Sequence, residues 1–257
     1  MRDELITVKP FEFIDYIAME GNQGFGKHGT FKVIGHIAAE KEQEYLNLMT
    51  AQTWVHVDAV TYDGIIKNVF KGIIWNADIE KVGETCVLTL NLITGSRLMD
   101  TLRHIRSFQD AGITYAAMMD TVMKAYPNNR YSMTVGQGST IPGLVLQYDE
   151  TDWEFARRLA SHFGTDIYSD SAYEGVKIYF GEPDSGGGSE VNTNEYSVVK
   201  RNNESYSYTV RLRELYHLGE WLNFNGMKVW ISEIHTELAG SELYHTYHLV
   251  QPNVIRV

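Results

Sequence analysis

The 257-residue chain has one cysteine, Cys86, which lies in the apolar run "TCVLTLNLI". Without a second cysteine the chain cannot form an internal disulfide, and it cannot surround a metal ion with several thiolates. We therefore interpret Cys86 as a small buried hydrophobic residue.

The chain also lacks long apolar runs. No stretch approaches the roughly 20 consecutive apolar residues that a membrane-spanning helix needs. The opening segment, "MRDELITVKP", contains no apolar core of the kind found in signal peptides. We expect synthesis in the cytoplasm without a signal peptide, and no stable insertion into a membrane.

Positive charge is scarce. Lysine and arginine total 22 against 33 aspartates and glutamates, which gives a formal net charge of -11. A protein that binds duplex nucleic acid needs clustered cations to displace the counterions of the phosphates. The sequence therefore argues against specific nucleic-acid binding.

Alternation typical of β strands dominates both ends of the chain. Residues 11–92 are rich in β-branched and aromatic residues of alternating polarity, and residues 196–250 return to this pattern. The pairs Asp63-Gly64 and Asn225-Gly226 favour hairpin turns, because both tolerate positive φ angles. We predict antiparallel β structure at both ends, and the similar size of the two ends suggests a duplicated architecture.

The middle of the chain is mixed. The segment "ITYAAMMDTVMKAYP" predicts a helix that stops at Pro127, and "GLVLQY" and "GVKIYFG" predict strands. Residues 182–195 are rich in glycine, serine and acids, which predicts an exposed loop. The predicted fold class is α+β and mainly β. We expect a first β-barrel domain in residues 1–95, an α/β insert in 96–184, and a second β-barrel domain in 185–257 that strands from elsewhere in the chain complete.

The stretch "LQYDETDWEFARRLASHFG" contains several helix signals that agree with one another. Thr151 and Glu154 have the spacing of a capping box, and a glycine supplies the C-terminal stop. Phe155, Leu159 and Phe163 are spaced by four, which predicts one buried stripe. The acidic residues fall at the entrance of the helix, and we expect them to lie away from that stripe.

Four acids crowd this entrance: Asp149, Glu150, Asp152 and Glu154. Two of them could serve as the proton donor and the nucleophile of a glycosidase. However, a helix N-terminus stabilises carboxylates as anions and lowers their pKa, whereas a general acid needs a raised pKa. We favour capping over catalysis and assign no catalytic residue.

Two further patterns are weighed as ligand sites. Gly24 to Gly29, "GFGKHG", matches the dinucleotide fingerprint in letters, but the strand-like "TFKVIGHI" follows where a helix should begin, so we predict a flexible β loop. His245 and His248 are three apart on a predicted strand, which places them on opposite faces. We expect no cofactor and no metal site.

The long motif resembles the signature of the phage late-control protein D family. In that family a strand ends in Gln-Tyr, an acidic turn follows, and a helix with Phe-x-x-Arg-Leu leads to a glycine. The matching residues, for which the resemblance implies a structural role, are Gln147, Tyr148, Glu150, Thr151, Asp152, Trp153, Phe155, Arg158, Leu159 and Gly164. The segments "RSFQ", "VFKGIIWNADI" and residues 219–249 resemble other parts of the family, so the likeness spans most of residues 10–250.

The family includes the baseplate hub proteins of contractile-tailed phages and the hub part of the valine-glycine-repeat spike proteins of type VI secretion. The resemblance implies two tube-protein-like β-barrels per chain and a homotrimer whose six barrels mate with a hexameric tail tube and a trimeric spike. It also implies contacts with other baseplate proteins, and assembly into a baseplate after synthesis in the bacterial cytoplasm. Because the sequence stops at Val257, soon after the second predicted barrel, we expect the spike to be a separate protein or a part outside this sequence.

The main hypothesis is therefore a non-enzymatic hub of a contractile phage tail or a tail-like injection system. One alternative is a peptidoglycan hydrolase of the tail tip that uses the four acids. Another is a carbohydrate- or receptor-binding β module, suggested by 16 tyrosines and 5 tryptophans. The sequence leaves open whether the particle is a phage, a bacteriocin-like particle or a secretion system. We expect barrel edges to form the contacts between subunits.

Overall fold

The computed structural model describes most of the chain, and it is mainly β with a few helices, as predicted. Side chains of Val82 and residues 198–202 are not described. The described residues are 5–49, 52–60, 64–83, 85–184, 188–191, 198–202 and 207–251.

The described residues of the first β unit form six strands and a short helix, α1 (Glu42–Leu48), which follows the 3-10 turn Ala39–Lys41. The strands are β1 (Leu5–Lys9), β2 (Asp15–Gly24), β3 (Thr30–Ile37), β4 (Trp54–Val60), β5 (Ile66–Val82) and β6 (Thr85–Ile93). They curl around one hydrophobic core, in which Cys86 is buried as expected. The Tyr16 hydroxyl donates to the Ile6 carbonyl (3.1 Å), linking the two end strands β2 and β1.

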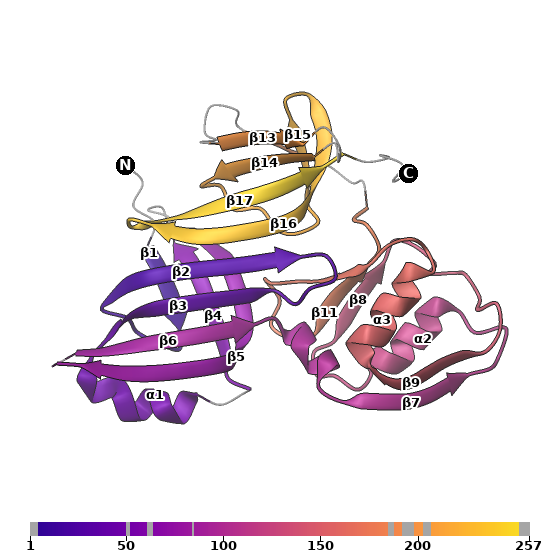
Figure 1. The fold of residues 1–257 in the computed structure, drawn as a ribbon, viewed down its shortest axis with the longest axis horizontal. Helices are drawn as coiled ribbons and strands as arrows, with labels where there is room; N and C mark the ends of the chain where they lie inside the picture. Colours follow the sequence, from indigo (N-terminus) through magenta and orange to yellow (C-terminus); the bar gives the residue numbers. More distant parts are fainter. Residues whose placement is uncertain are drawn as a thin grey trace.

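The insert follows as a separate α/β layer. Its elements are the 3-10 helix η2 (Gly95–Asp100), β7 (Arg103–Phe108), α2 (Tyr115–Met123), β8 (Arg130–Met133), β9 (Val145–Thr151), α3 (Asp152–Ser161), β10 (Ile167–Ser169) and β11 (Lys177–Phe180). Strands β7 and β9 form a two-stranded antiparallel ribbon, and β10, β11 and β8 form a second small sheet. Helices α2 and α3 pack their apolar sides between these sheets, which gives the insert its own core (Figure 1).

The second β unit closes the chain. Its strands are β12 (Ser189–Glu190), β13 (Val198–Asn202), β14 (Ser207–Leu212), β15 (Trp221–Phe224), β16 (Met227–Ala239) and β17 (Glu242–Val250). The predicted Asn225-Gly226 turn is confirmed, because both residues have positive φ between the antiparallel strands β15 and β16. The other predicted turn involves Asp63, which lies outside the described residues.

The stretch at 182–195, which was expected to be an exposed loop, agrees with that expectation only in part. Residues 185–187 and 192–195 lie outside the described residues. Ser189 and Glu190 are exposed, but they form β12 and pair with β15, and Val191 is buried in the core of the second unit. A short main-chain ladder and one apolar anchor therefore hold part of this stretch. The limits of the three domains stay predictions.

The two β units repeat one topology. The strand order of the first unit is β1-β4-β5-β6-β3-β2, and that of the second is β12-β15-β16-β17-β14-β13. Adding eleven to each strand number converts the first order into the second. One pair departs from the repeat, since β1 and β4 are antiparallel whereas β12 and β15 are parallel. The suggestion of a duplicated architecture is confirmed at the level of strand order.

The two units share a single sheet. Strand β2, at the end of the first order, pairs antiparallel with β16 over five residues, so that ten strands form one continuous path (Figure 1). Leu243, which belongs to the second unit, is buried in the core of the first. Among the described residues no helix is long and apolar enough to span a membrane.

Candidate functional site

The motif helix α3 begins as its sequence predicts. The Thr151 hydroxyl accepts from the Glu154 main-chain N–H (3.1 Å), and the Glu154 carboxylate accepts from the Thr151 N–H (2.9 Å). This reciprocal pair is the predicted capping box, and it satisfies two main-chain donors that the helix leaves without partners. The helix ends before Gly164, whose φ of +68° suits glycine.

The apolar residues of the motif build the core of the insert. Phe155 and Leu159 are fully buried on α3, and the Phe155 ring stacks on Phe108 at 5.9 Å between centroids. Phe163 is only partly buried and packs against the same core. The predicted stripe is confirmed for Phe155 and Leu159, and Phe155 attaches α3 to the ribbon, whereas Phe163 lies beyond the end of α3.

Asp152 contradicts the expectation that the acids lie away from the buried stripe of α3, because its side chain is itself fully buried. It forms an ion pair with Arg106, and it accepts hydrogen bonds from the Gln147 amide (2.9 Å) and the Tyr126 hydroxyl (2.7 Å). His104 Nε2 lies 3.5 Å from the same carboxylate. Alternation along β9 predicts that Gln147 faces inward, but nothing in the helix pattern predicts that these donors converge on Asp152.

The pKa of Asp152 is lowered. Burial alone would raise it, but the hydrogen bonds from Arg106, Gln147 and Tyr126 together outweigh that effect. The carboxylate is thus held as a buried anion. A general acid requires the opposite shift.

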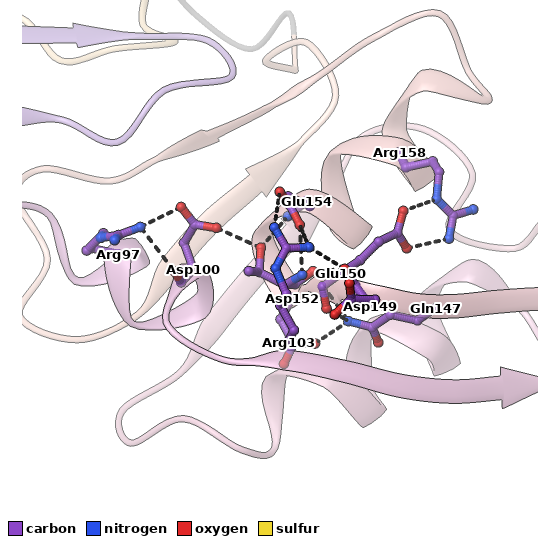
Figure 2. A network of polar contacts seen from close by, with 10 residues as sticks. Arg97, Asp100, Arg103, Gln147, Asp149, Glu150, Asp152, Glu154 and Arg158 are labelled. Carbon is purple, nitrogen blue, oxygen red and sulfur yellow. Dashed lines mark hydrogen bonds and ion pairs between the residues drawn. The ribbon is translucent and has the colours of Figure 1, made fainter.

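Two further acids of the motif are engaged in ion pairs around this centre (Figure 2). Glu150 receives a bidentate pair from Arg158, with both N–O distances 2.7 Å, and Arg158 also donates to the Leu146 carbonyl (2.7 Å). Arg103 lies 3.3 Å from Glu154, the capping residue. These contacts fasten α3 to β9 and β7.

Asp149 contributes to the turn through its main chain. Its φ is +51°, and the ladder between β7 and β9 shifts register at this point, so Asp149 is the extra residue of a β-bulge. Its carbonyl accepts from Arg103. The bulge lies two residues before Thr151, the N-cap of α3.

Trp153 connects the motif to the first β unit. Its ring lies against the His28 ring at 4.1 Å between centroids, and His28 Nδ1 is 2.8 Å from the Ser96 hydroxyl. His28 Nε2 is buried without a hydrogen bond and is 3.5 Å from an Asp100 oxygen, which is an ion-pair distance only. Burial lowers the pKa of His28 to about 4, against the smaller opposing effect of Asp100.

The glycine-rich segment at residues 24–29 lies at the same contact between the first β unit and the insert. It connects β2 to β3 and opens no helix, as predicted. However, it is anchored rather than free, because the Gly26 N–H donates to the Ile167 carbonyl (2.7 Å) and the Gly29 N–H donates to the Thr94 hydroxyl (3.1 Å). A Cβ on Gly26 would lie 2.4 Å from the Asp166 carboxylate. The glycines therefore allow close approach of the insert.

The outer face of the β7–β9 ribbon carries large apolar residues that the sequence reading did not single out. Ile105 and Tyr148 are paired directly across the two strands. Both are about two-thirds exposed or more (72% and 66%), and Leu146 on β9 and Leu144 just before it are exposed as well. Single exposed apolar residues are ordinary, whereas these four occupy alternate positions along and just before β9 and a paired position on β7. The sequence pattern that could have indicated this patch is the run "GLVLQY", in which apolar residues occupy both alternating sets of strand positions.

The exposed face of the paired strands β2 and β16 is polar. A hollow of about 360 Å³ lies there, with Asn22, Thr30, His235, Thr246 and His248 among its lining residues. His235 Nδ1 on β16 is 2.9 Å from the Asn22 amide oxygen on β2. His245 is buried against Thr236 and His248 contacts Ser232, in agreement with the predicted opposite faces. Within the described ranges no three His, Cys, Asp or Glu residues are grouped to hold a metal ion.

Searches with the sequence find no matching protein-family model and no matching curated protein. Solved structures do match along nearly the whole chain. The tail protein from Neisseria meningitidis MC58 has a TM-score of 0.70 at 10% identity, covering 98% of this chain and 97% of that one. The prophage MuSo2 43 kDa tail protein from Shewanella oneidensis has a TM-score of 0.69 at 8% identity, with 98% and 99% covered.

A third similar structure is the E. coli c3393 protein, described as a component of the type VI secretion system with structural similarity to the T4 bacteriophage tail proteins gp27 and gp5. Its TM-score is 0.69 at 13% identity, covering 97% of this chain and 77% of that one. The chain therefore has the fold of phage tail proteins and of a type VI secretion component. The resemblance inferred from the motif is confirmed at the level of the fold.

Proposed function

We propose that the chain is a structural hub protein of a contractile phage tail or a tail-like injection system. Three copies form a ring that adapts a hexameric tail tube to a trimeric spike, and the spike is a separate chain or a part outside this sequence. The observation that carries the proposal is the repeated topology within one continuous sheet. A trimer of such chains presents six similar β units, which lets a threefold assembly match a sixfold tube without breaking closure.

The proposed role is structural rather than catalytic. Three of the four acids that suggested a hydrolase are bound in the capping box, the bidentate pair and the buried cluster around Asp152. The apolar face of the β7–β9 ribbon supplies a surface for other baseplate proteins. The proposed ring works inside an assembled particle, without stable membrane insertion and without specific nucleic-acid binding.

The test is assembly with partners. The full chain, mixed with its tube and spike partner proteins, is expected to form a ring of three subunits, measured by native mass spectrometry and by projection images along the particle axis. A chain that stays monomeric in the presence of both partners would refute the proposal. Peptidoglycan turnover that disappears in a Glu150→Gln, Glu154→Gln double variant would favour the hydrolase instead.

A further inference from the structure

A hollow of about 340 Å³, named here the insert hollow, lies where the insert meets the second β unit. Its lining includes Tyr168, Asp170 and Tyr179 from the insert, and His217, Leu218, Gly219 and Glu220 from the second unit. This volume is typical of sites for small organic groups, and it far exceeds the roughly 30 Å³ that one water molecule occupies. Within the described part of the chain, no three metal-binding side chains are grouped to hold an ion there. The insert hollow therefore has the size of a site for an organic group.

Tyr168 brings a hydroxyl without a partner to this hollow. The residue is only 3% exposed, and its ring stacks against Phe25 at 4.4 Å and against Tyr179 at 4.7 Å between centroids. The hydroxyl reaches the wall that Gly219 forms, because a Cβ on that glycine would lie 2.4 Å from it. No described residue forms a hydrogen bond with this hydroxyl. Since a buried hydroxyl without a partner is unfavourable, a ligand that bonds to it gains free energy.

Three carboxylates also line the insert hollow: Asp170, Asp184 and Glu220. Asp170 is compensated, because Lys177 Nζ lies 2.7 Å away and the Tyr179 hydroxyl donates to it (3.0 Å). Asp184 is exposed and Glu220 is half-buried, and neither forms an ion pair with a lysine or arginine of the described ranges. Three negative charges thus face one positive charge. A concave site with an excess of one sign concentrates ions of the other sign.

Glu220 is the acid of this group that most needs a positive partner. Burial raises the pKa of its carboxyl group, and His217 opposes this with smaller effects. A cation nearby would favour the charged form and lower that pKa again. The main chain of Glu220 is held on both sides, because its N–H donates to the His217 carbonyl (3.1 Å) and its carbonyl accepts from the Ile231 N–H (3.0 Å). The carboxyl group is therefore carried by a well-fixed segment.

We propose that the insert hollow binds an alkylammonium or guanidinium group, carried either by a free polyamine or by a lysine or arginine side chain of a partner protein. Glu220 and Asp184 pair with the cation, and its N–H groups donate to the Tyr168 hydroxyl oxygen. Leu218 and Pro183 also line the hollow and suit the aliphatic stem that carries such a group. The site goes beyond the proposed hub function and does not depend on it.

Other classes of ligand fit the insert hollow less well. An anion would be repelled by the carboxylates. A sugar ring needs an open aromatic face to pack on, but Phe25 and Tyr179 stack on the Tyr168 ring and cover it. A cation satisfies the acids and the hydroxyl oxygen together.

A cation bound here joins the insert to the second β unit. Tyr168 lies on β10 of the insert, whereas Glu220 directly precedes β15 of the second unit. A ligand that binds only the folded chain raises its free energy of unfolding. Saturation with ligand is therefore expected to raise the unfolding temperature and to slow hydrogen exchange on both sides of the hollow, in β10 and in residues 217–220.

The first experiment titrates the full chain with small probes and measures binding by calorimetry at low ionic strength, where charge pairs are screened least. Spermidine represents a free polyamine, and N-acetyl-arginine amide represents the side chain of a partner. N-acetyl-citrulline amide has nearly the shape of the arginine probe but no charge. We expect spermidine, the arginine probe or both to bind at one site per chain, and the citrulline probe not to bind.

Two substitutions test the contacts that the proposal names. Glu220→Gln removes the charge with little change of shape, and we expect the affinity to fall about tenfold. Tyr168→Phe keeps the stacked ring and removes only the hydroxyl, and we expect the affinity to fall about fivefold. Because no described residue bonds to that hydroxyl, Tyr168→Phe should not lower the unfolding temperature of the free chain. A tyrosine with a purely structural role would not weaken ligand binding in this way.

The matched control is Glu40→Gln. Glu40 is an exposed acid on the 3-10 turn of the first β unit, and it does not line the insert hollow. This variant changes the net charge by the same amount as Glu220→Gln, and we expect it to keep the full affinity. The comparison separates a specific site from the general attraction of cations to a chain with a net charge of -11.

The probes also distinguish the two sources of the cation. Binding of spermidine alone, lost in Glu220→Gln, identifies a free polyamine, and binding of the arginine probe alone, lost in the same variant, identifies the side chain of a partner. Binding of both, with the same loss, supports the shared chemistry.

Three results would overturn the inference: no binding of either charged probe at about 1 mM, equal binding of the citrulline probe, or equal affinities in Glu220→Gln and Glu40→Gln. If Glu220→Gln did not fold, an unchanged affinity in Tyr168→Phe would overturn it as well. The titrations use the chain alone, so a failure here leaves the hub function intact, whereas a chain that forms no ring with its tube and spike partners would overturn the hub function itself.

Discussion

At the scale of single residues, Asp152 is the point on which the polar contacts of the insert converge. Its buried carboxylate accepts hydrogen bonds from Arg106, Tyr126 and Gln147, which lie on different elements or loops. Arg106 also neutralises its charge. Removing one partner of a buried ion pair leaves the other charge without compensation. The motif acids therefore act on stability first.

We expect Asp152→Ala to lower the free energy of unfolding by about 3–5 kcal/mol, the usual cost of breaking a buried ion pair. The measurement is the midpoint of urea unfolding followed by circular dichroism. Glu154→Gln is the control, because glutamine can keep the capping-box contact, and we expect a loss below about 1 kcal/mol. Equal effects of the two substitutions would contradict the role assigned to Asp152.

His28 makes stability depend on pH. Its folded pKa is about 4, below the unfolded value near 6.5, so the unfolded chain binds more protons between these values. The contribution to stability is complete above pH 6.5 and is lost as the pH falls toward 4. The full shift is worth up to about 3 kcal/mol.

The measurement compares unfolding midpoints at pH 7 and pH 4.5 for the chain and for His28→Gln. We expect the variant to lose less stability on acidification. It keeps a residual dependence, because burial also lowers the pKa of His245, to about 3. An unchanged pH dependence in the variant would show that His28 is not the group responsible.

At the scale of elements, the start of the insert depends on close main-chain approach. Gly95 opens η2, and a Cβ there would lie 2.1 Å from the Gly175 carbonyl oxygen and 2.7 Å from the Trp54 ring. The first neighbour is a main-chain atom, and the second is the outer edge of a rigid aromatic ring. The junction therefore has no room for a methyl group.

We expect Gly95→Ala to cost about 1–3 kcal/mol of stability through overpacking. The matched substitution is Gly138→Ala, where nothing lies within 4 Å of the new Cβ, and we expect a change within about 0.5 kcal/mol. Thermal unfolding of both variants is the measurement. If Gly95→Ala unfolded at the same temperature as Gly138→Ala, the tight junction would be refuted.

At the scale of the whole molecule, the two β units share a sheet, and side chains of the second unit pack into the core of the first. Leu243 of β17 is buried in the core of the first unit, and Leu215 and Leu238 pack against that core. A disturbance in the second unit should therefore reach the first. The fold therefore couples the two units through side chains as well as through the shared sheet.

We expect Leu243→Ala to cost about 2–5 kcal/mol and to increase hydrogen exchange in both β17 and β3. Leu249→Ala, in the core of the second unit, should raise exchange mainly in that unit. Exchange followed by mass spectrometry distinguishes the two patterns. A Leu243→Ala effect confined to the second unit would contradict the coupling.

The sequence by itself determined the local elements. The capping box at Thr151 depends on residues three apart, and the turn at Asn225-Gly226 depends on two adjacent residues, so local spacing was enough to predict both. Alternation predicted the β-rich ends, and the motif predicted a fold that solved tail proteins share.

Only the tertiary structure decided which distant segments meet. It buried Asp152, because Arg106 and Tyr126 come from segments whose distance in the chain carries no periodic signal. It also placed β2 against β16, more than 200 residues away, and thereby showed that one strand order occurs twice. Edge pairing depends on main-chain groups that every residue possesses, so sequence alone leaves the choice of partner open until packing fixes it.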